Sequence, residues 1–279
     1  MDMAYTSEEL GIKSFYKYRS LDNYKYTEKM LKNGHIFLSD STTFNDPFDS
    51  SIDETVDCTN EELRSYLIKH RFDEYEISQI ISKNNNGSLD FSNIFKKNNK
   101  ESFRVYCLSK NYDNLLMLSH YADKHKGICI GLKTTIFGNS LTLKCESGYL
   151  DNRIRGNNNY LPIFRVDYNN SKPDPYNLIK MNKENIKQFF FRKSKCWSYE
   201  EEYRIFLDKN IVKNNPVVIN LNEISEIYLG MRIEEEQKRK IIEIINNYNC
   251  KSIRVFQMLE VKGKYQINPE LISKYVYVA

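Results

Sequence analysis

Segments with the pattern of a β-strand recur along most of the chain, and this distribution most constrains the fold. Alternating or short continuous apolar runs predict strands over residues 15–19, 35–38, 103–108, 127–132, 141–145, 161–167, 202–207, 217–221, 227–229 and 253–259. Helical periodicity marks residues 22–34, 114–123, 176–190 and 233–247. Strands and helices interspersed in this way predict one α+β domain, built on a single mixed sheet, across residues 1–279.

One long stretch, residues 59–102, lacks strand patterning and has helical patterning instead. Thr59 or Asn60 precedes Glu61 and Glu62, as at a helix N-terminus with a capping side chain. We therefore predict a helical insertion over residues 59–102 that covers one side of the sheet. In the earlier helix, Asp22 is the expected N-cap and Gly34 the expected left-handed residue at the C-terminus.

Composition indicates the cellular compartment of the protein more clearly than its activity. The net charge of +4 permits a polyanionic partner without requiring one. The six cysteines show no CxxC spacing, which favours free thiols in a reducing compartment. The N-terminus lacks a signal-peptide pattern, and no apolar run approaches the roughly 18 residues of a membrane span. We expect a cytoplasmic protein with no membrane contact, and the sequence does not indicate its oligomeric state.

The acidic run at residues 200–204 is the first candidate for chemistry. If the strand includes Glu200, then Glu200, Glu202 and Arg204 share one face, and Glu201 and Tyr203 share the other. The simple alternative is a solvated edge strand with an internal ion pair. Because the apolar residues 205–207 follow, we predict that the acids lie where a strand enters the core.

Residues 44–49, F-N-D-P-F-D, form a second candidate segment. Asn45, Asp46 and Pro47 are ordinary turn residues. We predict that Phe44 and Phe48 hold this turn against the core and that Asn45, Asp46 and Asp49 point to one place.

Residues 119–127, S-H-Y-A-D-K-H-K-G, contain two of the four histidines. His120 and His125 are five positions apart and lack the intervening carboxylate of a zinc motif, so no metal site is predicted. The alternative is a helix end, with His125 favoured by the helix dipole and Gly127 as the stop. Arg19 ends the first predicted strand. It is a candidate site residue only if the fold brings it close to the acidic strand.

Four motifs occur together in one order: Y-K-Y-R-S at residues 16–20, F-N-D-P-F-D within 34–49, L-S-H-Y-A-D-K-H-K-G at 118–127, and K-x-x-x-W-x-Y-E-x-E-Y-R at 193–204. In these motifs the chain resembles a bacterial family known as domain of unknown function 2971. Leu118 departs from that pattern, since the family often has tryptophan there. The resemblance implies no activity, so the function must be argued from the site.

A second resemblance is to ADP-ribosyltransferases of the poly-ADP-ribosyl type. Those enzymes have a strand ending in H-G-S/T, a G-x-Y-F-A-D strand and a late N-E-Y-I strand that carries the catalytic acid. Similar segments lie here in the same order at residues 18–20, 34–40 and 201–205. Arg19 replaces the histidine, as in the arginine-serine-glutamate branch of the superfamily. Ile36 replaces the stacking tyrosine, so Phe37 or a nearby tyrosine would stack on nicotinamide.

The second resemblance implies an ADP-ribosyltransferase-like fold, NAD as substrate, and a toxin or phage-defence effector that modifies nucleic acid or protein. Glu202 would stabilise oxocarbenium-like charge on the ribose, and Glu200 would orient or deprotonate the acceptor. Arg19 would hold the pyrophosphate through charge-assisted hydrogen bonds. The residues expected to contact NAD are Arg19, Ser20, Phe37, Ser39, Asn45, His120, Tyr121 and Arg204.

Two other functions fit the same residues. In a metal-dependent nuclease, carboxylates would bind magnesium or manganese while Lys195 or Arg204 supports the phosphate; the four carboxylates are Asp46, Asp49, Glu200 and Glu202. In a non-enzymatic binding or sensor module, the acids and arginines would form a structural ion-pair network. The three alternatives stay open at the level of sequence.

Overall fold

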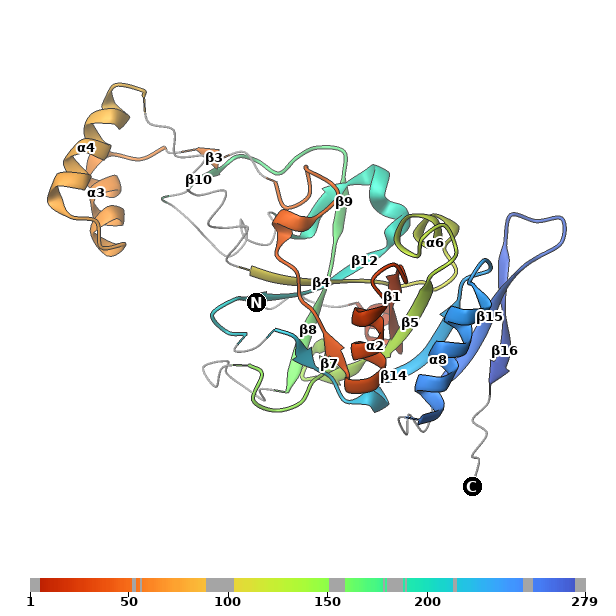
Figure 1. The fold of residues 1–279 in the computed structure, drawn as a ribbon. Helices are drawn as coiled ribbons and strands as arrows, with labels where there is room; N and C mark the ends of the chain where they lie inside the picture. The colour runs from red at the N-terminus through yellow and green to blue at the C-terminus, as the bar shows by residue number, and fades with distance from the viewer. Residues whose placement is uncertain are drawn as a thin grey trace. The chain divides into compact units, whose positions relative to one another are not determined.

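The computed structural model describes residues 6–51, 54–55, 57–88, 103–150, 159–177, 179, 188, 190–212, 215–247 and 253–273. The chain divides into two compact units (Figure 1). We call Asp40–Ser102 with Asp167–Lys195 the helical unit, and Asp2–Ser39, Phe103–Val166 and Cys196–Ala279 the sheet unit. Each unit is described by itself.

A ten-stranded sheet organises the sheet unit. Its strands, in spatial order, are β16 (Ile267–Ser273), β15 (Arg254–Glu260), β14 (Ile224–Leu229), β5 (Ile128–Lys133), β1 (Ser14–Arg19), β4 (Phe103–Ser109), β12 (Glu202–Asp208), β8 (Tyr160–Arg165), β7 (Ser140–Lys144) and β6 (Thr135–Phe137). Neighbouring strands are antiparallel except β14 and β15, which run parallel. The predicted α+β class with a mixed sheet is therefore confirmed.

Two apolar cores pack on opposite faces of this sheet because successive strand residues alternate between faces. On β1, Phe15 belongs to the larger core, whereas Tyr18 belongs to the smaller one. The helices α2 (Tyr24–Asn33) and α8 (Glu235–Asn247) lie beside each other against the larger core (Figure 1). Helix α6 (Leu115–Tyr121) packs into the smaller core.

The shorter elements of the sheet unit connect these strands and helices. They are α1 (Ser7–Leu10), η2 (Lys195–Glu200) and η3 (Leu221–Glu223), and a two-stranded antiparallel pair of β2 (His35–Ile36) with β13 (Val217–Val218). Ser39, just after β2, forms an isolated bridge with Val105 of β4. None of the helices that the structure describes is long and apolar enough to cross a membrane.

The helical unit contains two capped helices and short strand pairs. Helices α3 (Asn60–Lys69) and α4 (Glu74–Asn85) each begin with a capping box and pack around Leu63, Leu67 and Ile77. The other elements are η1 (Ser41–Thr43), β3 (Glu54–Thr55) with β10 (Tyr176–Asn177), and β9 (Asp167–Asn169) with β11 (Arg192–Ser194).

Local capping rules predict several helix ends correctly. Thr59 caps α3 with Glu62, and Gly34 ends α2 at φ 69°. Helices lie in the described part of residues 59–102, up to residue 88, and residues 89–102 lie outside the described part. The single domain and the insertion remain predictions.

Other assignments are wrong. Asn23 rather than Asp22 occupies the N-cap of α2, because the Asp22 carboxylate accepts a hydrogen bond from Ser20 Oγ at 2.7 Å. The helix predicted over residues 176–190 is wrong at Tyr176–Asn177, which form β10 and pair with a strand far away in sequence, whereas the described residues 188 and 190 are helical. Residues 178, 180–187 and 189 of that prediction lie outside the described part. Strands β6 and β16 were not predicted.

We predict that Gly34→Ala destabilises the protein far more than Gly138→Ala. Both glycines have positive φ, 69° and 59°, so either alanine costs about 1 kcal/mol or slightly more in backbone strain. A Cβ on Gly34 would also lie 2.0 Å from the Ile219 carbonyl oxygen, whereas a Cβ on Gly138 meets nothing within 4 Å. Overpacking should add about 1 to 3 kcal/mol at Gly34 alone. Urea unfolding measures both values, and equal losses would contradict the close approach.

Candidate functional site

The hydrogen-bonded ladder of the large sheet is interrupted between β1 and β4. Strand β1 pairs with β5 at six positions, and β4 pairs with β12 at seven. Across the described residues, β1 and β4 share one paired position, Tyr16 with Ser109. We call this place the β1–β4 junction. Charged side chains from β1, β12 and the segment before β12 interact around it.

Arg204 and Glu202 form a buried ion pair on β12. Arg204 Nε lies 2.7 Å from Glu202 Oε1, and Arg204 Nη2 lies 2.9 Å from Glu202 Oε2. Arg204 is 0% exposed and Glu202 is 4% exposed. Two parallel charge-assisted hydrogen bonds hold both groups in a fixed orientation. The predicted shared face of these two residues is therefore observed, as an ion pair.

Glu200 is positioned by the turn before β12 and not by strand alternation. It ends η2, and Glu201 has a φ of 41°, so β12 begins only at Glu202. The strand predicted over residues 202–207 is therefore confirmed, but strand alternation does not place Glu200 on the face of Glu202 and Arg204. Glu200 is buried and accepts a hydrogen bond from the Tyr121 hydroxyl at 2.6 Å. Ser109 Oγ donates to the Glu200 carbonyl oxygen at 2.7 Å, which anchors this turn to β4.

The turn after α6 brings the histidine segment against β1. Asp123, Lys124 and His125 have φ values of 42°, 52° and 68°, a run of left-handed residues that reverses the chain in place of the predicted glycine stop. A Cβ on Gly127 would lie 2.1 Å from the Arg19 carbonyl oxygen, so Gly127 permits the approach.

The two histidines of this segment differ in environment. His125 Nε2 lies 3.1 Å from Ser119 Oγ, and burial lowers the pKa of His125. His120 is exposed, with its ring 6.1 Å from that of Tyr199. The segment therefore contributes Tyr121 to the β1–β4 junction through its hydrogen bond to Glu200.

Lys17 is a site residue that the sequence analysis missed. Its Nζ donates to the Cys107 carbonyl oxygen at 2.9 Å and lies 4.6 Å from the centroid of the Tyr106 ring. Burial lowers the pKa of Lys17, and Arg19 adds to this effect, while Cys107, Glu202 and Glu200 oppose it. Alternation along Phe15–Arg19 could have paired Lys17 with Arg19, since both follow Phe15 on one face.

Tyr106 lies between these two basic residues. Burial raises the pKa of Tyr106 to about 12, and Arg19 opposes the rise through its charge and a hydrogen bond. Burial, followed by the charge of Glu202, also raises the pKa of the neighbouring Cys107 thiol. By strand alternation, Lys17, Arg19 and Tyr106 lie on the face of the larger core, whereas Cys107, Glu202 and Arg204 lie on the opposite face of the sheet.

The remaining residues predicted to contact NAD in the sheet unit lie around this strand system. Ser20 Oγ is engaged with Asp22, and Ser39 is exposed and pairs through its backbone with Val105. Phe37 packs edge to face on Tyr26, with centroids 4.8 Å apart. Nothing in the structure tests their binding roles.

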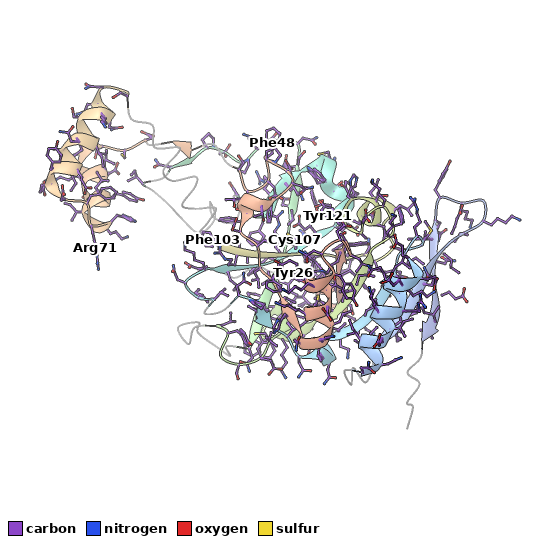
Figure 2. All side chains as sticks on the ribbon, viewed as in Figure 1. Tyr26, Phe48, Arg71, Phe103, Cys107 and Tyr121 are labelled. Atoms are coloured by element: carbon purple, nitrogen blue, oxygen red, sulfur yellow. The ribbon has the colours of Figure 1, made fainter. Side chains whose placement is uncertain are left out.

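The segment at residues 44–49 belongs to the helical unit. Asp46 Oδ1 accepts the backbone N–H of Phe48 at 2.9 Å, which is ordinary turn closure. The buried Asp49 pairs with the buried Lys193 at 3.4 Å, linking two of the four motifs. Asn45 is exposed. Phe48 is 66% exposed, so the prediction that it holds the turn to the core is wrong (Figure 2).

The four carboxylates of the nuclease alternative come from both units. Asp46 and Asp49 lie in the helical unit, and Glu200 and Glu202 lie in the sheet unit. Within the residues that the structure describes, no group of three or more His, Cys, Asp or Glu side chains could hold a metal ion.

We predict that breaking the Glu202–Arg204 pair strongly destabilises the sheet unit. Glu202→Gln or Arg204→Met leaves one buried charge without its main partner, which costs about 3 to 5 kcal/mol. Glu8→Gln is the control, because its ion pair with Lys110 is exposed and should contribute about 1 kcal/mol or less. Chemical denaturation compares the variants, and similar losses at both pairs would contradict a buried network.

Lys17→Met should flatten the dependence of stability on pH. Because the folded pKa of Lys17 is lowered from 10.5, the unfolded chain binds more protons, so stability rises with pH up to that value. Unfolding measured between about pH 8 and about pH 10 should show this rise in the wild type and a smaller one in Lys17→Met. Lys13→Met, at an exposed position of the preceding segment, should keep the wild-type slope.

Comparisons with known proteins identify a family for the part of the chain that builds much of this junction. No curated protein and no solved structure matches the chain. The matched region contains Tyr121, Glu200, Glu202 and Arg204, whereas Lys17 and Arg19 precede it. Residues 117–205 match the family model described as Protein of unknown function (DUF2971), which confirms the family resemblance that the motifs predict.

Proposed function

We propose that the chain is an NAD-dependent ADP-ribosyltransferase-like enzyme, a toxin or phage-defence effector, that modifies a nucleic acid or a protein. The observation that carries this proposal is the pair of basic residues on β1. Lys17 and Arg19 flank Tyr106, and neither forms an ion pair with any carboxylate among the described residues. Both cations are half-buried, and Lys17 donates to a backbone carbonyl, so an anionic ligand would supply the opposite charge that the described chain does not.

A pyrophosphate suits these two basic residues. Its two negative charges would meet the Arg19 guanidinium directly, through charge-assisted hydrogen bonds. Lys17 would add attraction from the same face of β1 and would be more fully protonated with an anion nearby.

The acids beside the junction suit the chemistry of the nicotinamide–ribose bond. Cleavage builds positive charge on the ribose, and a carboxylate held in place lowers the energy of that state. Arg204 fixes the orientation of Glu202 through two hydrogen bonds. Tyr121 holds Glu200, which is assigned the orientation or deprotonation of the acceptor. Phe37 is the proposed neighbour of the nicotinamide.

The test measures transfer from labelled NAD to nucleic-acid and protein acceptors, together with nicotinamide release. Glu202→Gln should lower kcat by about 100-fold or more, as loss of a transition-state charge partner does. Arg19→Met should mainly raise KM for NAD. Glu226→Gln is a matched control, because Glu226 is also a buried sheet carboxylate paired with an arginine, Arg254, and lies on β14. It should keep wild-type activity in its folded fraction.

Two results would overturn the proposal: no transfer and no nicotinamide release with any acceptor, or wild-type turnover by Glu202→Gln. Cleavage of DNA or RNA that needs a divalent metal and stops with a chelator would support the nuclease alternative instead.

The second candidate function is a non-enzymatic binding or sensor module. Arg204 and Glu202 are joined by two hydrogen bonds and are buried in the sheet. Such a pair can have a purely structural role, which favours this second function. In that case Glu202→Gln would lower stability and change no activity, and Arg19→Met would weaken binding of an anion that is never turned over.

A further inference from the structure

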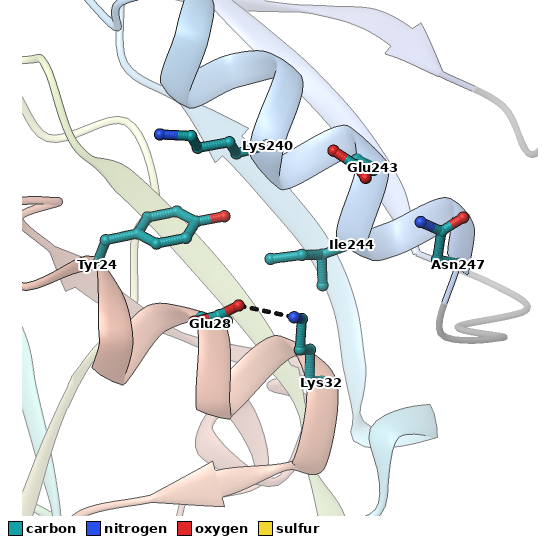
Figure 3. Close-up of a pocket in the computed structure, with 7 residues that line it drawn as sticks. All are labelled: Tyr24, Glu28, Lys32, Lys240, Glu243, Ile244 and Asn247. Atoms are coloured by element: carbon teal, nitrogen blue, oxygen red, sulfur yellow. Dashed lines mark hydrogen bonds and ion pairs between the residues drawn. The ribbon is translucent and has the colours of Figure 1, made fainter.

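A pocket of about 360 Å³ lies between α2 and α8 in the sheet unit (Figure 3). This volume falls in the range of small-molecule sites. Tyr24, Glu28 and Lys32 line it from successive turns of α2, and Lys240, Glu243 and Ile244 line it from α8. None of these residues takes part in the charged groups of the β1–β4 junction.

Two buried polar atoms on the facing helices have no hydrogen-bond partner among the described residues. They are Tyr24 Oη on α2 and Gln237 Oε1 on α8. Of these two residues, Tyr24 lines the pocket and Gln237 does not. Figure 3 shows the Tyr24 hydroxyl directed toward α8. Buried polar atoms are normally satisfied, so both atoms indicate a missing polar partner.

The two lysines that line the pocket have ion-pair partners, whereas one of the two glutamates has none in the described chain. Lys32 Nζ lies 2.7 Å from Glu28 Oε1, and Lys240 Nζ lies 2.5 Å from Glu236 Oε1. Glu243 forms no ion pair within the described part of the chain. Burial raises the pKa of Tyr24, the charges of Glu28 and Glu243 raise it further, and Lys32 opposes them. The lining groups without a partner in the described chain are thus the exposed Glu243 carboxylate and the Tyr24 hydroxyl, which lies near negative charge.

We propose that this pocket binds the protonated amino group of a small primary alkylamine. An ammonium group has three N–H donors and no acceptor, which suits two acceptors on lining residues, the Glu243 carboxylate and Tyr24 Oη. The alkyl chain would pack on Ile244 and on the methylene groups of the lysines. An organic anion fits less well, because both lysines already have carboxylate partners. A neutral alcohol offers one donor and no charge for Glu243.

Isothermal titration of the full-length protein tests this proposal with three probes of equal chain length: butylammonium, butyrate and 1-butanol. Butylammonium should bind with a measurable dissociation constant, and the other two should bind at least about tenfold more weakly, since they lack charge-assisted donation.

Variants of pocket residues test whether butylammonium binds in this pocket and not elsewhere on the protein. Glu243→Gln and Tyr24→Phe should each raise the dissociation constant for butylammonium about tenfold or more. Glu235→Gln is the control on the same helix, because Glu235 pairs with Lys238 and does not line the pocket. Tyr24→Phe should also unfold at a temperature no lower than the wild type without ligand, since it removes an unpartnered hydroxyl.

The proposal would be overturned by no binding of butylammonium at millimolar concentration, by equal binding to Glu243→Gln and wild type, or by tighter binding of butyrate. Equal heats for all three probes would show apolar association only and would also overturn it.

Discussion

The burial of the Arg204 guanidinium within the large sheet is the constraint on which the rest of the site depends. A charge with 0% exposure is tolerated only beside a fixed opposite charge, and Glu202 supplies it two positions away on the same face. To present Glu202 there, β12 must begin at that residue, and Glu201 takes the left-handed conformation that allows this start. Glu200 is then left on the preceding turn, where Tyr121 and Ser109 hold it.

This arrangement separates the acids at the junction from the basic residues. Arg204 and Glu202 satisfy each other, so their pair adds little net charge. Lys17 and Arg19 are on the other strand of the interrupted ladder, with Tyr106 between them and no ion-pair partner in the described chain. Where the described ladder between β1 and β4 has one paired position, the Lys17 ammonium donates to the backbone carbonyl of Cys107 on β4.

The sequence analysis correctly predicted the parts of this site that depend on residues close together in the sequence. Strand alternation gives the shared face of Glu202 and Arg204, and helix rules give the ends at Thr59 and Gly34. Contacts across long sequence separations could not be derived in this way. Tyr121 and Glu200, which form one of these contacts, are 79 positions apart in the sequence. Lys17 was missed because a strand lysine is ordinarily solvated, whereas here it contacts Cys107 and Tyr106 of β4, about 90 positions away. Phe48 was misplaced because aromatic residues need not be buried when a turn is closed by Asp46.

Glu226 is a useful comparison for the polar groups that lack partners in the described chain. It is a buried carboxylate on β14, and the fold surrounds it with donors from three strands: the Tyr16 hydroxyl at 3.4 Å, the Tyr228 hydroxyl at 2.8 Å and the Arg254 guanidinium. The same sheet thus supplies complete partners where a charge serves structure. Against this standard, Lys17 and Arg19, which form no ion pair with a described carboxylate, and the Tyr24 hydroxyl, which has no hydrogen-bond partner in the described chain, are departures. Because leaving a polar group without a partner costs free energy, we propose an anion as the partner on β1 and a cation as the partner between α2 and α8.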